Sequence, residues 1–402
     1  MNNLPFNLNR KIRIAHLITG IGSGGAGEDT LCTIEGLDKV KYQIDLIMGK
    51  KLRDDKLKRI RNKGINFIQI QPFRSRYHFL YDSILLLKLM ILFKKGHYDI
   101  IHTHTTKSGI LGSIAAKLAG VPIIIHGLEI NALEVCSSKF IKIIKMFLEK
   151  MISKFTDAYI SVSEIVSQKY LEYGIGKKAK YFTVRSGIEL NKFLNAREDM
   201  DIRQTSQELG INREDFVIGN VGRLVESKGH YFLFQAIKKI LEIRNSRPVK
   251  LLLIGEGEDK EKLIKYAKEL NLEKNVIFTG YRENVEELMV LMDIFVLTSL
   301  REGLSRVLVE AAAAGLPSIA FNIDGIPEII KDNHNGFLVE PRNVIQLAEK
   351  ISKYIDNKPL VLMHGRNGRE FVKGKWSIEG MVKETEQIYN DLVEKKITNK
   401  IR

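Results

Sequence analysis

Cysteine is scarce in this 402-residue chain, which contains only Cys32 and Cys136. Two cysteines cannot supply the several disulfides that hold small secreted domains together, so we expect an apolar core and a reducing, cytosolic environment. Long apolar runs are also missing. The longest, from Ile84 to Phe93, is interrupted by Lys88 and is shorter than the roughly 20 residues of a membrane-spanning helix. The first 18 residues hold one short apolar run, which is typical of a strand and not of a signal peptide.

Low-complexity segments are absent, and the content of 44% hydrophobic and 28% charged residues is that of a globular protein. The net charge is +15, of which residues 1–200 carry +14 through 32 basic and 18 acidic side chains. A basic half fits nucleic acid, an anionic membrane surface or phosphorylated substrates. Aromatic residues do not alternate with the basic ones, and no nucleic-acid module is recognisable, so we expect no nucleic-acid partner.

Short β-branched runs alternate with longer amphipathic segments along the whole chain. The predicted strands are residues 11–18, 42–48, 65–70, 98–104, 121–127, 157–163, 180–184, 216–222, 249–257, 275–280, 293–299 and 316–321. Apolar strands separated by helices indicate parallel sheets that are covered on both faces. The alternation restarts after the polar stretch 191–215, which predicts two doubly wound α/β domains. Ligands bind beyond the carboxyl ends of such strands, so we expect the site in the cleft between the two sheets.

The stretch from His16 to Thr30 is rich in glycine and follows the first predicted strand. Two overlapping sets fit G-x-G-x-x-G, namely Gly20, Gly22 and Gly25, and Gly22, Gly24 and Gly27. A dinucleotide site also needs an acid at the end of the second strand, where this chain has Gly49, Lys50 and Lys51. We therefore favour a loop that contacts a phosphate or a substrate across the cleft, over a dinucleotide site or a turn without a ligand.

The stretch 298–321 carries two acids eight residues apart, Glu302 and Glu310. Glu302 follows a strand, and Glu310 lies within the predicted helix 305–314. Two such acids can bind the hydroxyls of a sugar and of a ribose, although a pair of solvated helix acids is the ordinary alternative. Backbone N–H groups at the start of the helix can face a phosphate. These groups belong to Gly303, Leu304 and Ser305.

Two cations, Arg223 and Lys228, follow the first strand of the second half. An arginine fork and a lysine point charge can together neutralise a pyrophosphate. Three glycines follow the next two strands and allow close backbone approach; they are Gly255, Gly257 and Gly280.

Together these motifs resemble the retaining family 4 glycosyltransferases of the bacterial polysaccharide and glycolipid type. The matching segments in the second half are GNVGRLVESKG, LLLIGEGED, FTGY, REGLSRVLVEA and GLPSIAFNIDGIPEII. Those in the first half are IGSGGAGED, DIIHTHTTKSGILGSIAAKLAGVPIIIHGLE and AYISVSE with VRSGIEL. The resemblance implies the GT-B fold, in which two Rossmann-like domains face a central cleft. It implies an acceptor-binding domain at 1–192, onto which a helix at about 377–402 packs back, and a donor-binding domain at 193–376.

The resemblance also implies a role for each matching residue. Arg223 and Lys228 would bind the donor pyrophosphate, Glu302 the sugar hydroxyls and Glu310 the ribose. His126 would contact the reacting sugar as a second catalytic residue beside Glu302. The remaining donor contacts would come from Gly280, Tyr281, Arg282, Gly303, Leu304 and Ser305. The loop toward the phosphates or the acceptor would comprise Gly24, Gly25 and Glu28; it departs from relatives in which an arginine often follows the acid.

The expected activity is the transfer of a sugar from a nucleotide-diphosphate sugar, most commonly a UDP-sugar in this family, to a lipid-linked or polysaccharide acceptor. The alternatives are a GT-B sugar-nucleotide epimerase and a non-catalytic sugar-binding subunit. The chain's D-x-D sequence, Asp199-Met-Asp201, falls in the linker. We therefore expect no cofactor and no metal, with Arg223 and Lys228 taking the place of Mg²⁺.

Two further features have both an ordinary and a functional interpretation. His102 and His104 end a strand, and we favour packing or cleft-lining histidines over a metal site, which needs further ligands. The segment 138–155 is amphipathic and basic. It is either a plain surface helix or a segment that docks onto anionic lipid near a lipid-linked acceptor. We accordingly expect a cytoplasmic protein, in the second case peripheral at the inner face of the plasma membrane.

Overall fold

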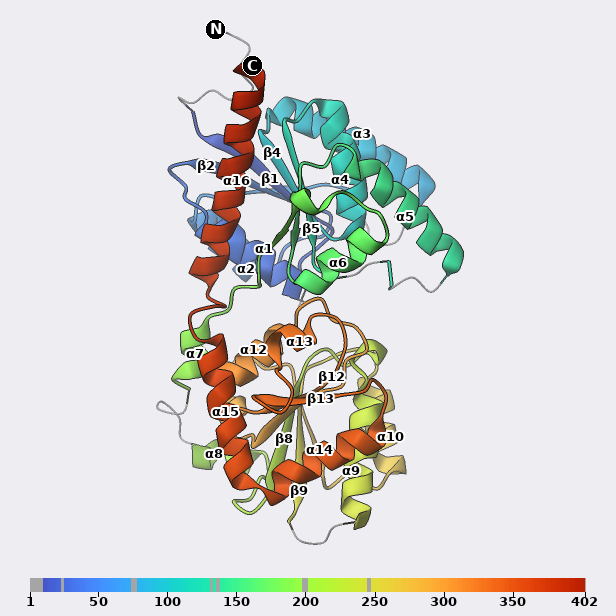
Figure 1. Cartoon of the computed structure of the whole chain (residues 1–402), viewed down its shortest axis with the longest axis vertical. Helices are drawn as coiled ribbons and strands as arrows, with labels where there is room; N and C mark the ends of the chain where they lie inside the picture. Colours follow the sequence, from blue (N-terminus) through green and yellow to red (C-terminus); the bar gives the residue numbers. More distant parts are fainter. Residues whose placement is uncertain are drawn as a thin grey trace. The chain divides into compact units, whose positions relative to one another are not determined.

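The computed structural model describes residues 10–22, 25–73, 78–130, 133–134, 138–196, 202–243 and 247–401. The chain forms two compact units. Unit 1 contains residues 1–187 and 378–402, and unit 2 contains residues 188–377. The predicted boundaries were 192 and 376. Each unit is built on one parallel sheet with helices packed against it, which confirms the predicted α/β class (Figure 1).

The sheet of unit 1 has seven parallel strands in the order β3-β2-β1-β4-β5-β6-β7. The strands are β1 (Ile12–Ile18), β2 (Tyr42–Met48), β3 (Asn66–Gln69), β4 (Ile100–His104), β5 (Ile123–Leu128), β6 (Ala158–Ser161) and β7 (Tyr181–Thr183). The chain moves outward from β1 to β3 and then returns to place β4 on the other side of β1. This reversal makes the carboxyl ends of β1 and β4 a topological switch point, the usual place for a ligand.

Helices cover both faces of this sheet because successive side chains of a strand point to opposite faces. Ile14 and Ile18 of β1 belong to an apolar layer shared with α1 and α16, whereas Ala15 and Leu17 belong to a layer shared with α3 and α4. The helices of unit 1 are α1 (Gly25–Gly36), α2 (Asp54–Asn62), α3 (Phe79–Gly96), α4 (Thr106–Ala119), α5 (Lys139–Ser153), α6 (Glu164–Glu172), the 3₁₀ turn η1 (Lys178–Lys180) and α16 (Ile378–Ile401).

The last helix of the chain, α16, packs on α1 in unit 1, so the fold of this unit is closed by residues from the far end of the sequence (Figure 1). Tyr389 and Val393 of α16 are buried in the same apolar layer as Leu31 and Ile34 of α1. The Tyr42 hydroxyl donates to Asn390 Oδ1 at 2.9 Å. The buried face of α16 makes this helix an integral part of the core of unit 1.

The sheet of unit 2 has six parallel strands in the order β10-β9-β8-β11-β12-β13, with its switch point between β8 and β11. The strands are β8 (Phe216–Val221), β9 (Val249–Ile254), β10 (Val276–Gly280), β11 (Ile294–Leu297), β12 (Ser318–Phe321) and β13 (Gly336–Val339). The helices are α7 (Leu190–Leu194), α8 (Ile202–Glu208), the 3₁₀ turn η2 (Glu226–Lys228), α9 (His230–Ile243), α10 (Lys260–Glu269), α11 (Val285–Val290), α12 (Arg306–Ala313), α13 (Ile326–Ile329), α14 (Val344–Asp356) and α15 (Lys358–Val372).

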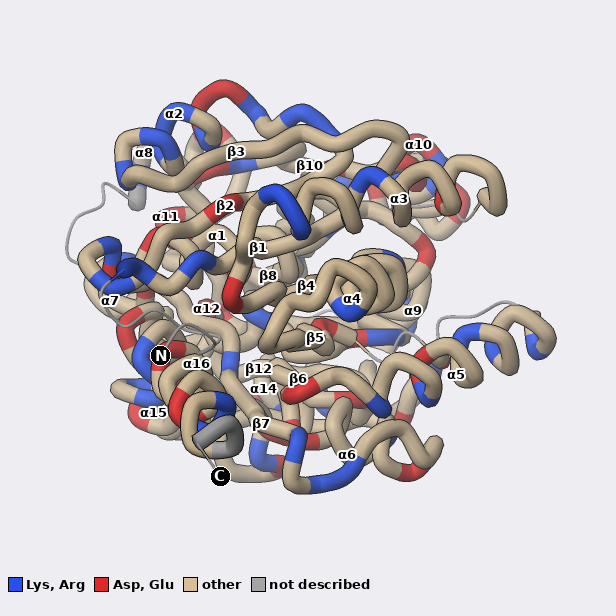
Figure 2. The backbone as a smooth tube through the Cα atoms, turned by 90° about the horizontal axis from the view of Figure 1, so that it is seen from above, with Lys and Arg blue, Asp and Glu red and all other residues tan. Residues whose placement is uncertain are grey.

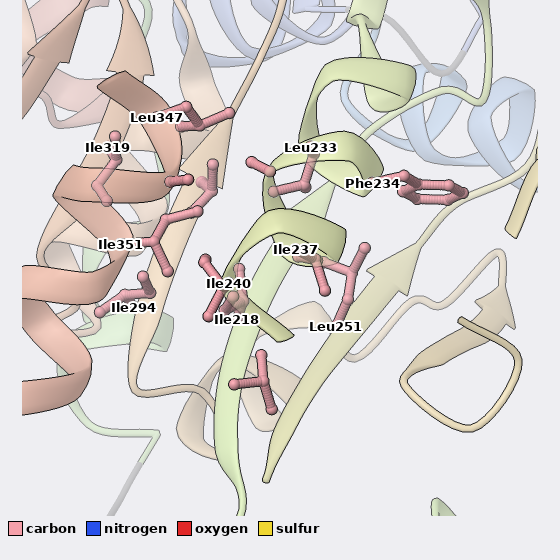
Figure 3. Close-up of a cluster of buried hydrophobic side chains, with 14 of the residues drawn as sticks. Ile218, Leu233, Phe234, Ile237, Ile240, Leu251, Ile294, Ile319, Leu347 and Ile351 are labelled. Carbon is pink, nitrogen blue, oxygen red and sulfur yellow. The ribbon is translucent and has the colours of Figure 1, made fainter. Parts of the chain in front are cut away.

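The core of unit 2 is formed where α9 and α14 pack against the sheet (Figure 3). Ile237 of α9 and Ile351 of α14 are both fully buried, as are Ile218 of β8 and Ile294 of β11. This packing holds the two central strands rigidly and therefore fixes the loops that leave their carboxyl ends.

Two helices of unit 1 carry large apolar side chains on their exposed faces. On α5, Phe140 and Phe147 are 70% and 67% exposed, and on α3, Phe79 and Leu80 are 86% and 64% exposed. Both helices pack against α4. Across the described ranges, no helix is both long enough and apolar enough to cross a membrane.

Candidate functional site

The loop after β8 is held against the loop after β9 by backbone contacts. The Gly222 N–H donates to Ile254 O at 3.0 Å, and the Leu224 N–H donates to Glu256 O at 3.0 Å. Gly255 has a φ of +143°, and a Cβ there would lie 1.9 Å from Gly222 O, so only glycine fits. This packing presents Arg223 as an exposed side chain at the carboxyl end of β8.

Lys228 and Glu302 are brought together from loops that follow the two central strands. Lys228 Nζ lies 2.6 Å from Glu302 Oε1, although the residues are 74 positions apart. Gly229, with φ +65°, makes this approach possible because a Cβ there would lie 2.1 Å from Thr298 O. The pair is mostly shielded, with Glu302 only 9% exposed. The positive charge of Lys228 thus offsets the negative charge of Glu302 at the position where an anionic ligand is expected.

Asp324, in the turn after β12, holds the backbone of Glu302. The Glu302 N–H donates to Asp324 Oδ2 at 2.8 Å, which fixes the direction of the Glu302 side chain. Sequence reasoning assigned no role to Asp324. The one available signal was its position before Gly325 in the quoted NIDG segment, and the structure gives it a positive φ of 43°.

Glu310 lies in the second turn of α12 and is half-buried. The pKa of its carboxyl group is raised, chiefly because the group is desolvated. The nearby cations Arg306 and Lys192 oppose this shift, and the acid Glu286 adds to it. Gly303, Leu304 and Ser305 are buried directly before α12. The first N–H groups of a helix lack partners within it, so this end of α12 favours a negatively charged group.

Tyr281 follows β10 and is 56% exposed at the end of the neighbouring strand. The Gly255 N–H donates to Gly280 O at 2.9 Å, which links the ends of β9 and β10. The predicted donor residues of unit 2 therefore lie along one edge of the sheet, because parallel strands end on the same side. They lie at or after the ends of β10, β8 and β11, and the end of β9 lies between those of β10 and β8. By contrast, a cavity of about 450 Å³ near Arg247 and Asp293 lies at the opposite edge, where β8 and β11 begin.

His126, predicted to contact the reacting sugar, lies on β5 in unit 1 and is only 1% exposed. Its Nδ1 lies 3.0 Å from Thr103 Oγ1, and its Nε2 lies 3.6 Å from Oε1 of Glu149 on α5. The ring packs so closely on α4 that a Cβ at Gly109 would lie 2.0 Å from its Cε1. In this conformation both ring nitrogens face protein groups.

The glycine-rich loop is only partly described. Gly24 lies outside the described residues, whereas Gly25 begins α1. Glu28, in the first turn of α1, forms an ion pair with Lys56 of α2. The adjacent Asp29, which sequence reasoning passed over, is buried and accepts a hydrogen bond from Ser186 Oγ at 2.5 Å. The acid expected to meet an acceptor is therefore already neutralised by a lysine of the same unit.

The histidines of β4 form a larger cluster than the sequence indicated. His16 of β1 joins His102 and His104, and the three can offer ring nitrogens within 4.8 Å of one another, close enough for a metal ion. The contacts form a hydrogen-bond chain, however: His104 Nε2 lies 3.0 Å from His16 Nδ1, and His102 Nδ1 lies 2.7 Å from the Tyr389 hydroxyl. Burial lowers the pKa of His16 and His102, which keeps them neutral. The arrangement fits packing histidines that tie β1 and β4 to α16.

Comparison with known proteins matches each half of the chain to a glycosyltransferase family model. The model of "Glycosyl transferases group 1" matches residues 201–371, and that of "Glycosyl transferase 4-like" matches residues 29–163. The chain is 31% identical to the capsular polysaccharide biosynthesis glycosyltransferase CapM of Staphylococcus aureus, over 79% of this chain and 83% of CapM.

Two further proteins match nearly the whole chain. The UDP-Gal:alpha-D-GlcNAc-diphosphoundecaprenol alpha-1,3-galactosyltransferase of Escherichia coli is 29% identical over 95% of this chain and 98% of its own length. The structure of Anabaena Alr3699/HepE in complex with UDP-glucose matches with a TM-score of 0.78 at 22% identity, covering 94% of this chain and 100% of that one. CapM and the E. coli relative are both named as glycosyltransferases, and neither name supports the epimerase or the non-catalytic alternative. The chain therefore belongs to the family 4 glycosyltransferases, enzymes with the GT-B fold.

Proposed function

We propose that this glycosyltransferase moves a sugar from a UDP-sugar to a lipid-linked or polysaccharide acceptor, with retention of configuration and without a metal ion. The observation that carries the proposal is the contact of Lys228 with Glu302 beside the exposed Arg223. The E. coli relative is named for a UDP-Gal donor and a diphosphoundecaprenol-linked acceptor, and the Anabaena neighbour was solved with UDP-glucose. Both names support a nucleotide-sugar donor here, and the E. coli name supports a polyprenyl-linked acceptor.

The chemistry follows from where charge develops. The leaving UDP gains negative charge as the bond to the sugar breaks, so cations aimed at its phosphates stabilise the transition state more than the ground state. Arg223, Lys228 and the N–H groups at the start of α12 would supply this stabilisation. Glu302 would bind the sugar hydroxyls and Glu310 the ribose, while Tyr281 would lie beside the base. His126, which is 1% exposed in this conformation, remains the predicted sugar contact of unit 1.

The first prediction concerns the donor and the metal. UDP is expected to raise the free energy of unfolding by about 2.7 kcal/mol when its concentration is 100 times its Kd. At the same concentration, GDP and ADP are expected to stabilise the protein less. Transfer is expected to proceed at an unchanged rate in excess EDTA, since two side-chain cations replace Mg²⁺. The measurements are a thermal shift series and initial rates, with the anomeric configuration of the product read by NMR. Loss of activity in EDTA that Mg²⁺ or Mn²⁺ restores would refute metal independence.

We further propose that α5 and α3 dock unit 1 onto an anionic membrane surface. The exposed phenylalanines of α5 are interleaved with lysines, which Figure 2 shows along this helix. Apolar side chains that enter the acyl boundary, with cations at the level of the headgroups, match an anionic bilayer in charge and polarity. Such docking would bring the enzyme to a lipid-linked acceptor.

The second prediction tests this surface. The protein is expected to sediment with vesicles that contain anionic lipid at low salt, and less with purely zwitterionic vesicles. Substitution of both Ile144→Glu and Phe147→Glu should abolish the binding, because it places two acids at the bilayer surface. The matched control is Ile243→Glu on α9 in unit 2, which changes a side chain that is 82% exposed. Docking is excluded if the wild type does not sediment with anionic vesicles, or if the double variant binds these vesicles as well as Ile243→Glu does.

A further inference from the structure

Glu149 is the most deeply buried acid of unit 1 that the proposed chemistry does not use. It lies on α5 and has no exposed surface, whereas Phe147, two positions earlier, is 67% exposed. Within the described part of the chain, neither of its carboxylate oxygens has a hydrogen-bond partner, and its ion-pair neighbour is His126 Nε2 at 3.6 Å. A buried carboxylate is costly unless it is paired, so this acid is retained against a large desolvation penalty.

The contacts of the His126 ring leave its Nε2 edge facing Glu149. Thr103 Oγ1 donates to Ile125 O at 3.2 Å, so the same hydroxyl accepts from His126 Nδ1–H. Nε2 then faces Glu149 Oε1 at 3.6 Å. If the Thr103 hydroxyl instead turns to donate to Nδ1, the neutral ring carries its proton on Nε2 and points it at Glu149. In either arrangement the carboxylate faces the Nε2 edge and sets the orientation of the ring.

The surroundings leave the ring little other freedom. Tyr159 of β6 packs edge-on against His126 with ring centroids 5.9 Å apart, and α4 closes over Cε1 at Gly109. Gly127 and Glu129 follow directly at the carboxyl end of β5, and Glu129 Oε1 lies 3.3 Å from His104 Nδ1. An anchored ring at position 126 therefore fixes the backbone at the end of β5, the edge where unit 1 has its switch point.

We propose that Glu149 is a positioning residue for glycosyl transfer, which acts by holding His126 in place from α5. The inference rests on the proposed function, since it assigns His126 to the sugar-facing edge of unit 1. It adds a group that belongs to unit 1, whereas the predicted donor residues belong to unit 2, so its effect should fall on turnover and leave donor binding unchanged. Small displacements of a positioned group can lower rates by about 10²-fold.

The test compares Glu149→Gln, Glu149→Leu and the exposed control Glu172→Gln. Glu149→Leu is expected to lower kcat at least tenfold with KM for the donor within about twofold. Glu149→Gln should retain most of the activity, because its isosteric amide fills the same space beside the Nε2 edge of His126. The ¹⁵N resonances of the His126 ring, identified by their loss in His126→Gln, should shift in Glu149→Gln, while those of His364 in unit 2 stay unchanged.

The proposal is overturned if the His126 resonances of Glu149→Gln match those of the wild type, or if folded Glu149→Leu keeps kcat within about twofold of the wild type. If Glu149→Leu does not fold, the His126 resonances of the isosteric Glu149→Gln variant decide whether the proposal holds. Absence of transfer by the wild-type protein with every donor would refute the proposed function, whereas the NMR comparison would still measure the contact between Glu149 and His126.

Discussion

Replacing Glu302 with alanine is expected to lower kcat/KM for sugar transfer by about 10²-fold. Hydrogen bonds from hydroxyls to a carboxylate are each worth about 1.5–3 kcal/mol, and loss of one or two accounts for an effect of this size. The side chain is well placed for the role, since Asp324 holds its backbone and Lys228 its carboxylate. Glu302→Gln should lower kcat/KM somewhat less, because the amide keeps the shape of the carboxyl group and one oxygen that accepts hydrogen bonds.

The binding of UDP separates this role from a structural one. UDP lacks the sugar, so its affinity for Glu302→Ala should change less than about threefold, as measured by calorimetric titration. Initial rates would be compared with those of Glu261→Ala, an exposed acid on α10 in the same unit. Full transfer activity in Glu302→Ala would show that sugar binding lies elsewhere, and a collapse of UDP affinity would show that the loop had been damaged.

Lys228→Ala is expected to weaken UDP binding by about 10²-fold and to lower the transfer rate at least as much. The substitution removes a cation from the phosphate site and leaves the Glu302 carboxylate without its partner next to an anionic ligand. Truncation of one partner of a shielded charge pair costs about 2–5 kcal/mol, much of it from the charge left behind. Lys228→Arg should restore only part of the affinity, because the guanidinium fork does not replace a compact ammonium group.

A double-mutant cycle distinguishes the two contributions. In Lys228→Ala/Glu302→Ala the repulsive carboxylate is gone as well, so UDP should bind more tightly than to Lys228→Ala alone. Arg223→Ala should show a smaller, salt-dependent loss, because Arg223 is exposed and its charge is screened. Lys265→Ala, on α10, serves as the control. If the losses of UDP binding free energy in the two single variants simply add in Lys228→Ala/Glu302→Ala, the 2.6 Å contact between Lys228 and Glu302 has no part in donor binding.

Much of the fold was predictable because buried parallel strands are apolar along their whole length. The predicted strands correspond to β1–β12, and the short β13 was not anticipated. The donor edge of unit 2 was predictable for a related reason. Glycines and charged residues directly after apolar strands, such as Gly255 and Lys228, stand out against the surrounding pattern.

The residues that were missed depend on contacts between distant elements. His16 joins His102 because β1 and β4 pair in a register that aligns these two positions, and strand register across more than 80 residues is not encoded locally. Glu149 gave no signal because an acid in a lysine-rich amphipathic helix is ordinarily solvated. Its burial follows from the packing of α5 on α4 and from its contact with His126 of β5. The pairing of Glu28 with Lys56 likewise depends on the packing of α1 beside α2.

The placement of α16 has a consequence for how the protein is made. The strands of unit 1 are synthesised before those of unit 2, yet the apolar layer around Leu31 and Ile34 of α1 is incomplete until α16 emerges from the ribosome. Unit 2 is continuous in sequence and can complete its core first, which reverses the usual order in which the N-terminal domain folds first. A premature stop codon at position 378 would therefore leave unit 2 intact. Unit 1 would lack α16, and its exposed apolar core would be open to chaperones and proteases.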